Sequence, residues 1–315
     1  MSSYAEVLED LEEFGIESCH VRNKDIIGFS GQNWDEDDAL EPRPTALFFH
    51  FPNKKKDEQW AVRGWHETTG VHGCVCRKPV ERWVFIADPG EVYVLGDGDD
   101  DDEKSITSKK PAFFTSLRCI AGGYAYAVGV GREVYRRTEP NKWQRLTTED
   151  LTKPLKGNLE NAGFDDIDGF AEDDLYACGP RGNLWHFDGK RWTREDIPTD
   201  AALEKIVCAA DGQVYITTDR HDIWTGRSGK WTPIRIDLGM EEFFQEIVDY
   251  QGLVIVSTDD ALYEVSTGAP RPLPIGQPPM SNFAHLASGD EVLVVAGVDE
   301  AFLFDGTRWR KIFQL

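Results

Sequence analysis

The feature of this 315-residue chain that most constrains its fold is a repeat with a period of 39 residues in the C-terminal half. Aromatic and aliphatic residues return at the same places in successive units without a gap. A fixed period of this length is typical of architectures in which one small supersecondary unit stacks on its neighbours. The four columns are Tyr176, Tyr215, Val254 and Leu293; Trp185, Trp224, Tyr263 and Phe302; Trp192, Trp231, Pro270 and Trp309; and Leu175, Val214, Leu253 and Val292.

One unit, from Ile167 to Arg194, divides into short apolar runs separated by turn residues. Asp188-Gly189 stands between two of these runs, and Asp305-Gly306 holds the same place in the last unit. Asp-Gly between apolar runs is a strong hairpin signal, because both central residues of the tight turn need positive φ. The pattern predicts four short strands in each unit, which is the content of a β-propeller blade.

Fainter copies of the unit precede the regular ones. Tyr126, Tyr135 and Trp143 form one copy, and an insertion between Thr147 and Gly163 separates it from the next. Runs at 83–86 and 92–95 indicate a further blade, and β-rich runs at 26–29, 46–51 and 60–65 indicate an irregular one. We therefore predict an all-β fold, a β-propeller of four-stranded antiparallel blades over residues 17–315, with seven blades and six as the alternative. The insertion should project from the face opposite the hairpins between third and fourth strands.

A separate element is predicted at the start of the chain. Apolar residues follow helical spacing, Ser3 and Glu6 can form a capping box, and Gly15 can end the helix. We expect residues 1–16 to form an amphipathic helix that packs on the propeller, with an independent partner-binding helix as the alternative. Its apolar positions are Tyr4, Val7, Leu8, Leu11 and Phe14.

The F-D-G-x-R-W motif, at Phe187–Trp192 and Phe304–Trp309, resembles the repeats of bacterial β-propeller proteins. The resemblance covers roughly residues 70–315 and implies the architecture without a function. Three better-known propeller subfamilies do not fit. Trp34-Asp35 is the one Trp-Asp pair, Gly122-Gly123 is the one Gly-Gly pair, and sialidase Asp-boxes are absent.

The charge balance excludes several classes of partner. With 34 Lys and Arg against 56 Asp and Glu, the formal charge is −22, and such a chain should repel nucleic acid and anionic lipid. No apolar run approaches the length of a membrane span, and the N-terminal sequence is acidic and lacks an apolar signal segment. Six scattered cysteines do not form a disulfide scaffold. We expect a cytoplasmic protein that is a monomer when free.

Two acidic runs are the candidate partner-binding sites. The first occupies the hairpin where Asp188-Gly189 stands in a regular blade, and the second lies in another predicted loop. Crowded carboxylates repel one another unless a cation or a basic partner neutralises them, although a solvated loop is the alternative. The first run does not have the ligand spacing of an EF-hand calcium loop. The candidate residues are Asp97, Asp99, Asp100, Asp101, Asp102 and Glu103, and Trp34, Asp35, Glu36, Asp37 and Asp38.

Catalytic and metal-binding patterns are weak. The most metal-like cluster joins His66 and His72 with Cys74 and Cys76, but a C-x-C places both thiols on one face of a strand and does not match structural zinc spacing. Buried small hydrophobic residues are the simpler interpretation of these cysteines. His186 and His221 are expected at hairpin surfaces. No metal and no cofactor is predicted, and the aromatic columns are expected to pack blades and not to bind sugar.

These observations favour a non-enzymatic acidic protein that captures a basic protein partner. One version is an immunity protein that neutralises a bacterial toxin such as a nuclease, whose active site is basic because it binds phosphate. The alternative is a propeller hydrolase or lyase with its site in the central channel.

Overall fold

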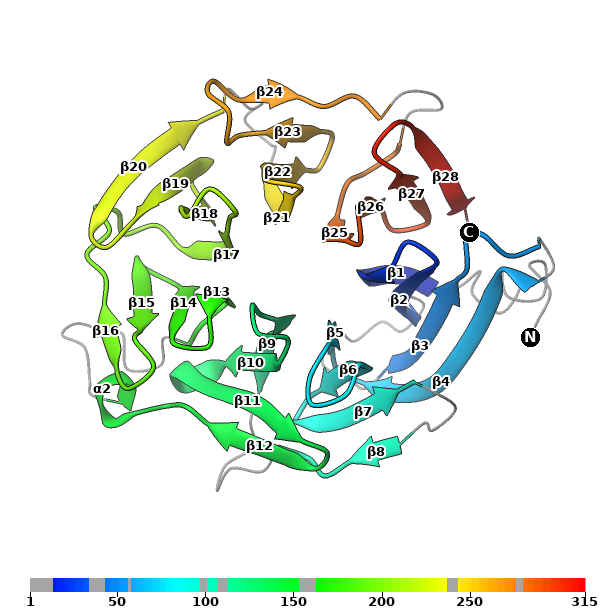
Figure 1. Cartoon of the computed structure of the whole chain (residues 1–315), viewed down its shortest axis with the longest axis horizontal. Helices are drawn as coiled ribbons and strands as arrows, with labels where there is room; N and C mark the ends of the chain where they lie inside the picture. The colour runs from blue at the N-terminus through cyan, green and yellow to red at the C-terminus, as the bar shows by residue number, and fades with distance from the viewer. Residues whose placement is uncertain are drawn as a thin grey trace. The chain divides into compact units, whose positions relative to one another are not determined.

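The computed structural model describes residues 14–33, 43–55, 58–96, 101–106, 113–152, 163–236, 243–275 and 280–314. Its strands form seven four-stranded antiparallel sheets, and within each sheet the strands are adjacent in chain order (Figure 1). Each sheet is a propeller blade, so the predicted count of seven is confirmed and the alternative of six is wrong. The chain divides into two compact units, Met1–Val71 with Glu242–Leu315, and His72–Glu241.

The first unit contains three blades. The backbone N–H of Ile16 donates to the carbonyl of Val298 at 2.8 Å, and this bond connects the start of the first blade to the last. The two blades share a core in which Phe29, Phe48 and Trp60 pack against Phe313. The blades are β1 (Phe14–Asn23), β2 (Ile26–Asn33), β3 (Arg43–His50) and β4 (Trp60–Thr68); β21 (Phe244–Tyr250), β22 (Leu253–Thr258), β23 (Leu262–Glu264) and β24 (Arg271–Pro272); and β25 (His285–Gly289), β26 (Val292–Ala296), β27 (Glu300–Phe304) and β28 (Trp309–Gln314).

The second unit contains four blades. The first strands of the last three lie in order, with β9 beside β13 and β13 beside β17. The blades are β5 (Val71–Cys76), β6 (Arg82–Ala87), β7 (Glu91–Leu95) and β8 (Asp101–Glu103); β9 (Phe114–Cys119), β10 (Ala125–Gly129), β11 (Glu133–Glu139) and β12 (Lys142–Arg145); β13 (Asp166–Ala171), β14 (Asp174–Gly179), β15 (Asn183–Phe187) and β16 (Trp192–Arg194); and β17 (Leu203–Cys208), β18 (Val214–Thr218), β19 (Asp222–Arg227) and β20 (Lys230–Arg235). A short 3-10 turn, η2 (Val130–Arg132), follows β10, and a one-turn helix, α2 (Glu149–Thr152), follows β12.

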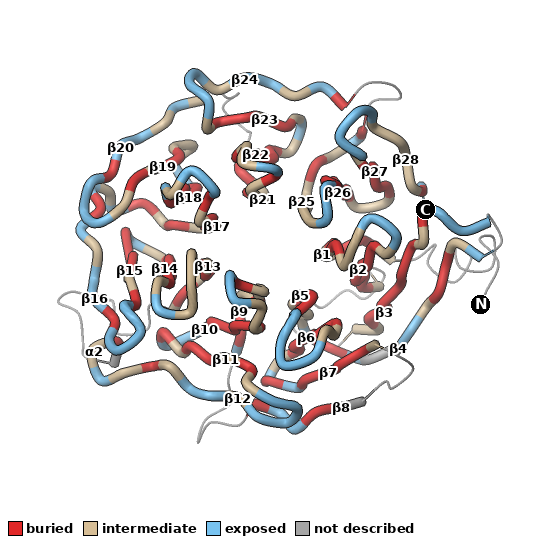
Figure 2. The backbone as a smooth tube through the Cα atoms, viewed as in Figure 1, coloured by how far each residue is buried: buried red, intermediate tan, exposed pale blue. Residues whose placement is uncertain are grey.

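The repeated aromatic columns fill the contacts within and between blades, as predicted. Trp185 and Trp192 are buried in a cluster that also contains Tyr126 and Val128 of the preceding blade. Tyr176 packs in turn with Ile206 of the next blade. In the blade formed by β13–β16, the inner strands β14 and β15 are largely buried, whereas the outer strand β16 is more exposed (Figure 2). A residue class that returns in every blade is therefore used for packing.

The predicted insertion joins β12 to β13, the last strand of one blade to the first of the next. Residues 153–162 of it lie outside the described part. Its first turn is anchored, because Leu151 of α2 is buried and its carbonyl accepts a hydrogen bond from the guanidinium of Arg132 at 2.9 Å.

The start of the chain differs from the prediction. Phe14, Gly15 and Ile16 were expected at the end of a helix, but they begin β1, where Phe14 pairs with Asn33 and Gly15 with Gln32. Pairing with β2 completes the four-stranded blade and outweighs a helical spacing that continues only to residue 14. Residues 1–13 lie outside the described residues. Among those described, no helix has the length and apolar character needed to cross a membrane.

Candidate functional site

The first acidic run continues into an edge strand. Asp97, Asp99 and Asp100 lie outside the described residues, but Asp101, Asp102 and Glu103 form β8, which pairs with β7 through Val94, Tyr93 and Val92. β8 is the last strand of its sheet, and among the strands that the structure describes none pairs with its other edge. Charged residues on such an edge also prevent pairing with the strands of other molecules.

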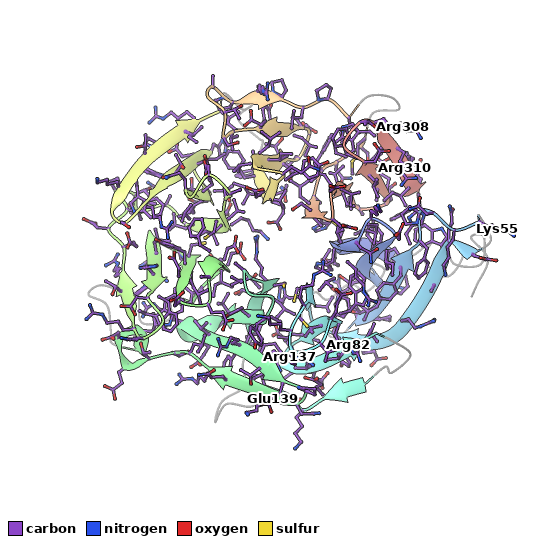
Figure 3. All side chains as sticks on the ribbon, in the orientation of Figure 1. Lys55, Arg82, Arg137, Glu139, Arg308 and Arg310 are labelled. Atoms are coloured by element: carbon purple, nitrogen blue, oxygen red, sulfur yellow. The ribbon has the colours of Figure 1, made fainter. Side chains whose placement is uncertain are left out.

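Glu103 has a structural partner and is not a surface carboxylate. Its side chain is 4% exposed and receives two hydrogen bonds from Arg137, whose side chain is 2% exposed. Arg137, labelled in Figure 3, comes from β11 of the following blade. The Arg137 Nη2 to Glu103 Oε1 distance is 2.5 Å and the Nε to Oε2 distance is 3.1 Å. We therefore assign Glu103 to the scaffold and remove it from the candidate binding residues.

The segment after β8 is also fixed. The backbone N–H of Lys104 donates to the Asn141 side chain at 2.8 Å, and that of Ile106 donates to the Gly90 carbonyl at 2.8 Å. The Ile106 side chain is buried in the core of the two blades. The C-terminal base of the acidic run is thus held in place by its own blade and by the next one.

The second acidic run lies outside the described residues. It stands between β2 and β3 and comprises Trp34, Asp35, Glu36, Asp37 and Asp38.

The cysteines of β5 are core residues. Cys74 and Cys76 are buried in an apolar cluster, which confirms this interpretation. The ring of His72 bonds to the Phe114 carbonyl at 3.0 Å. Among the described residues, no group of three or more His, Cys, Asp or Glu side chains could hold a metal ion.

His186 of β15, which was expected at a hairpin surface, also packs against its own blade. His186 stacks on Tyr176 with ring centroids 4.5 Å apart, and its Nε2 lies 2.9 Å from Asp174 Oδ1. The same carboxylate binds Arg227 of the next blade. His186 therefore helps to connect two blades, which accounts for its partial burial.

Sequence reasoning missed a group of carboxylates that the fold assembles in the second unit. Asp165 directly precedes β13, Glu204 lies near the start of β17, and Asp219 follows β18, which runs antiparallel to β17. All three therefore lie at the end of the blades where the first strands begin. Asp165 and Glu204 are 39 residues apart, which equals the repeat period, so aligning the repeats could have identified this pair.

Polar contacts centred on the buried Asp166 support this end. Asp166 receives hydrogen bonds from Ser116 Oγ at 2.7 Å and from the Ile206 backbone at 3.0 Å, and Arg118 Nη2 lies 2.8 Å from its carboxylate. Asp168 accepts a hydrogen bond from the Cys208 backbone at 2.8 Å. Both aspartates are on β13 and reach β17, so they fix one first strand against the next.

Burial outweighs the compensating interactions of the carboxylates at this end, where Lys205 acts to lower the pKa of Asp165 and of Glu204. Burial raises the pKa of Asp165 to about 6, and the charge of Asp166 adds to the rise. Burial also raises the pKa of Glu204, with smaller contributions from Asp219 and Asp165. Within the described residues, no hydrogen bond or ion pair reaches the carboxylate of Asp165 or Glu204. A cation placed here would favour the charged forms, and perturbed carboxylates of this kind are common at binding sites.

Comparisons with known proteins give one sequence relative and several structural neighbours. The search against family models found no match. The chain is 32% identical over 247 residues to the immune protein Tsi7 of Pseudomonas aeruginosa, covering 77% of this chain and 79% of that protein. Two solved structures are similar in fold: YCF48 bound to D1 peptide (TM-score 0.64, 11% identity, 91% of this chain and 90% of the other) and the WD40 β-propeller domain of Doa1 (TM-score 0.63, 12% identity, 90% of each chain). At these identities the two structures support the propeller fold alone.

Proposed function

The chain belongs to the family of the immune protein Tsi7, and from this membership we propose that it is an immunity protein that binds a basic protein toxin through its carboxylates. A family of immune proteins supports a binding function without catalysis, and the alternative of a propeller hydrolase or lyase does not fit it. The propeller fold alone favours neither. The basic character of the toxin, the cytoplasmic location and the monomeric state stay predictions.

The observation that carries this proposal is the 32% identity to Tsi7 over 247 residues, and the pair Asp165 and Glu204 supports the expected charge of the partner. Their raised pKa values show that the folded protein disfavours the charged forms of both side chains. A Lys or Arg side chain of a partner would lower these pKa values, and the free energy lost by burying the two charges would then contribute to binding. This argument requires a cationic partner, and it agrees with the formal charge of −22.

The acidic runs have a second role in this proposal. Residues 97–102 and 35–38 add to the negative field around the protein, which accelerates encounter with a cationic partner at low ionic strength. Since field effects of exposed charges decay over about 8 Å in physiological salt, we expect them to act on the association rate more than on the lifetime of the complex.

The function is tested by co-expression. Each open reading frame adjacent to this gene is expressed alone in a bacterial host and then together with this chain. We expect one product to be toxic alone and harmless in the presence of this chain, and the purified pair to form a complex. If no adjacent product is neutralised or bound, the proposed immunity function is wrong.

Neutralising the first run is expected to slow association with that toxin. In a variant with Asp97, Asp99, Asp100, Asp101 and Asp102 changed to Asn, the association rate should fall about three- to tenfold in low salt, and the difference should shrink as salt is added. Glu103 stays unchanged because it pairs with Arg137. Stopped-flow measurements at several salt concentrations provide the readout.

The control for this variant removes the same charge elsewhere. Glu6, Glu9, Asp10, Glu12 and Glu13 are changed to their amides, so the net charge is equal in both variants. Equal rates for the two variants would mean that total charge steers the toxin, and the first run would then have no special role.

A further inference from the structure

Two exposed apolar residues lie on adjacent, hydrogen-bonded backbone segments in the second unit. Phe113 is 50% exposed and Val130 is 53% exposed, and the backbone N–H of Val130 donates to the Phe113 carbonyl at 3.0 Å. Among the described residues, the other large hydrophobic side chains exposed to this degree are Val80 and Phe243. Single exposed hydrophobic residues are ordinary, whereas an adjacent pair forms a patch.

The patch lies on closely packed backbone. A Cβ atom at Gly129 would lie 2.0 Å from the Phe113 carbonyl oxygen, so only glycine permits this approach. The Phe114 N–H donates to Asp88 Oδ1 at 3.0 Å, and the Phe164 N–H donates to the Gly129 carbonyl at 3.1 Å. Four chain segments therefore meet at the patch, around Asp88, Phe113, Gly129 and Phe164. Such preorganisation lowers the entropy lost when a partner binds.

The carboxylates described above border the patch. Val130 Cα is 3.0 Å from the position of a Cβ atom at Gly163, and Asp165 follows two residues later on the same end of the blades. Glu204 lies beyond it on the next blade, within the electrostatic influence of Asp165 and Asp219. The side chains of Lys205 and His221 also lie near this border, and Arg118 pairs with Asp166 and Arg220 with Asp200.

We propose that this end of the second unit is the surface that binds the toxin, with Phe113 and Val130 as the apolar contact and Asp165 and Glu204 as the charged contact. The proposal rests on the proposed immunity function. The chemistry fits a toxin segment that presents an aromatic or aliphatic side chain next to a Lys or Arg side chain. A second copy of this chain fits less well, because two chains that each carry −22 repel one another.

The two parts of the surface have separate physical roles. An apolar contact that becomes fully desolvated controls how long a complex lasts, and charged groups around it orient the partner. This end is opposite the hairpin end that carries the first acidic run, because Phe113 and Asp165 precede first strands whereas that run lies between a third and a fourth strand. The residues proposed to contact the toxin and the acidic run proposed to attract it from a distance therefore lie at opposite ends of the blades.

The apolar contact is tested with the variant Phe113→Ala/Val130→Ala. Because both side chains are exposed, the change should leave the urea midpoint of unfolding nearly unchanged. We expect affinity for the toxin identified by co-expression, with its active site inactivated, to fall at least tenfold, mainly through faster dissociation. Val80→Ala is the matched control, since Val80 is also 50% exposed but lies between β5 and β6 at the other end of a blade. Its affinity should stay within about twofold of the original.

The charged contact is tested with Asp165→Asn/Glu204→Gln, and Asp173→Asn in the β13–β14 connection is the control at the other end. We expect a loss of about tenfold in low salt for the double variant and none for Asp173→Asn. The outcomes are distinguishable. A wild-type chain that binds no toxin overturns the proposed function, and with it this surface. A toxin that binds wild type and Phe113→Ala/Val130→Ala equally overturns this surface alone.

A third outcome concerns the second copy of the chain. If sedimentation shows that the free protein dimerises and that Phe113→Ala/Val130→Ala makes it monomeric, the patch is a self-association surface and the proposal is wrong. A monomer that forms a one-to-one toxin complex supports the proposal.

Discussion

Replacing Arg137 with methionine is expected to lower the free energy of unfolding by about 3 to 5 kcal/mol. The substitution leaves the Glu103 carboxylate buried, with its side chain 4% exposed and without its cation. Desolvation of an uncompensated charge has a large cost. Urea denaturation of the variant and the original chain measures the effect.

Two further variants make this prediction specific. Arg137→Met/Glu103→Met should recover most of the loss, because an apolar pair of similar volume can replace a buried ion pair at little cost. Arg145→Met should cost less than about 1 kcal/mol, because the Arg145–Glu133 pair in the same blade is also doubly hydrogen-bonded but has side chains that are 45% and 25% exposed. Equal losses for Arg137→Met and Arg145→Met would contradict the role assigned to burial.

The architecture could be predicted from the sequence because its determinants recur. Trp185 and Trp224 occupy the same place in successive blades, and each is buried against its neighbours. A packing requirement that repeats leaves a periodic pattern, even when single residues vary. The first blade was recognised less completely, since its strand Phe14–Asn23 follows a segment with helical spacing and its partner β2 provides the evidence for a strand.

The site could be predicted only in part, because its chemistry depends on contacts that no local pattern records. Glu103 belongs to a run of carboxylates in the sequence, yet Arg137, 34 residues later, converts it into a buried ion-pair partner. Phe113 and Val130 come together through a backbone bond between the segment that leads into β9 and the connection from β10 to β11. The pair Asp165 and Glu204 is an exception. Its spacing equals the repeat, so it was detectable once the blade register was known.

Replacing Asp165 with asparagine is expected to stabilise the protein at neutral pH. The folded pKa of Asp165 is about 6 against an ordinary value of 3.8, so the folded state favours the protonated form. The stability associated with this group is complete below pH 4 and is lost as the pH rises through 6. Asparagine does not ionise and avoids that loss. After allowance for the partial exposure of the side chain, the gain at pH 8 should be about 1 to 2 kcal/mol.

The pH dependence identifies the cause of this gain. The difference in urea midpoint between Asp165→Asn and the original chain should be near zero at pH 4, grow between pH 4 and 7, and stay constant above. Asp173→Asn, at the opposite end of the same blade, should show no such rise. A gain that is independent of pH would mean that asparagine packs better at this position, and the pKa of Asp165 would then not be the reason.

Stability and binding should change in opposite directions at Asp165. The ionised carboxylate of Asp165 lowers the free energy of unfolding of the free protein. A cationic partner stabilises the charged form, so the same group adds to the free energy of binding. If Asp165→Asn raises the urea midpoint at pH 8 while weakening toxin binding, the unfavourable carboxylate is explained by function. If it raises stability and leaves toxin affinity unchanged, the charge serves no contact, and the toxin must use other carboxylates.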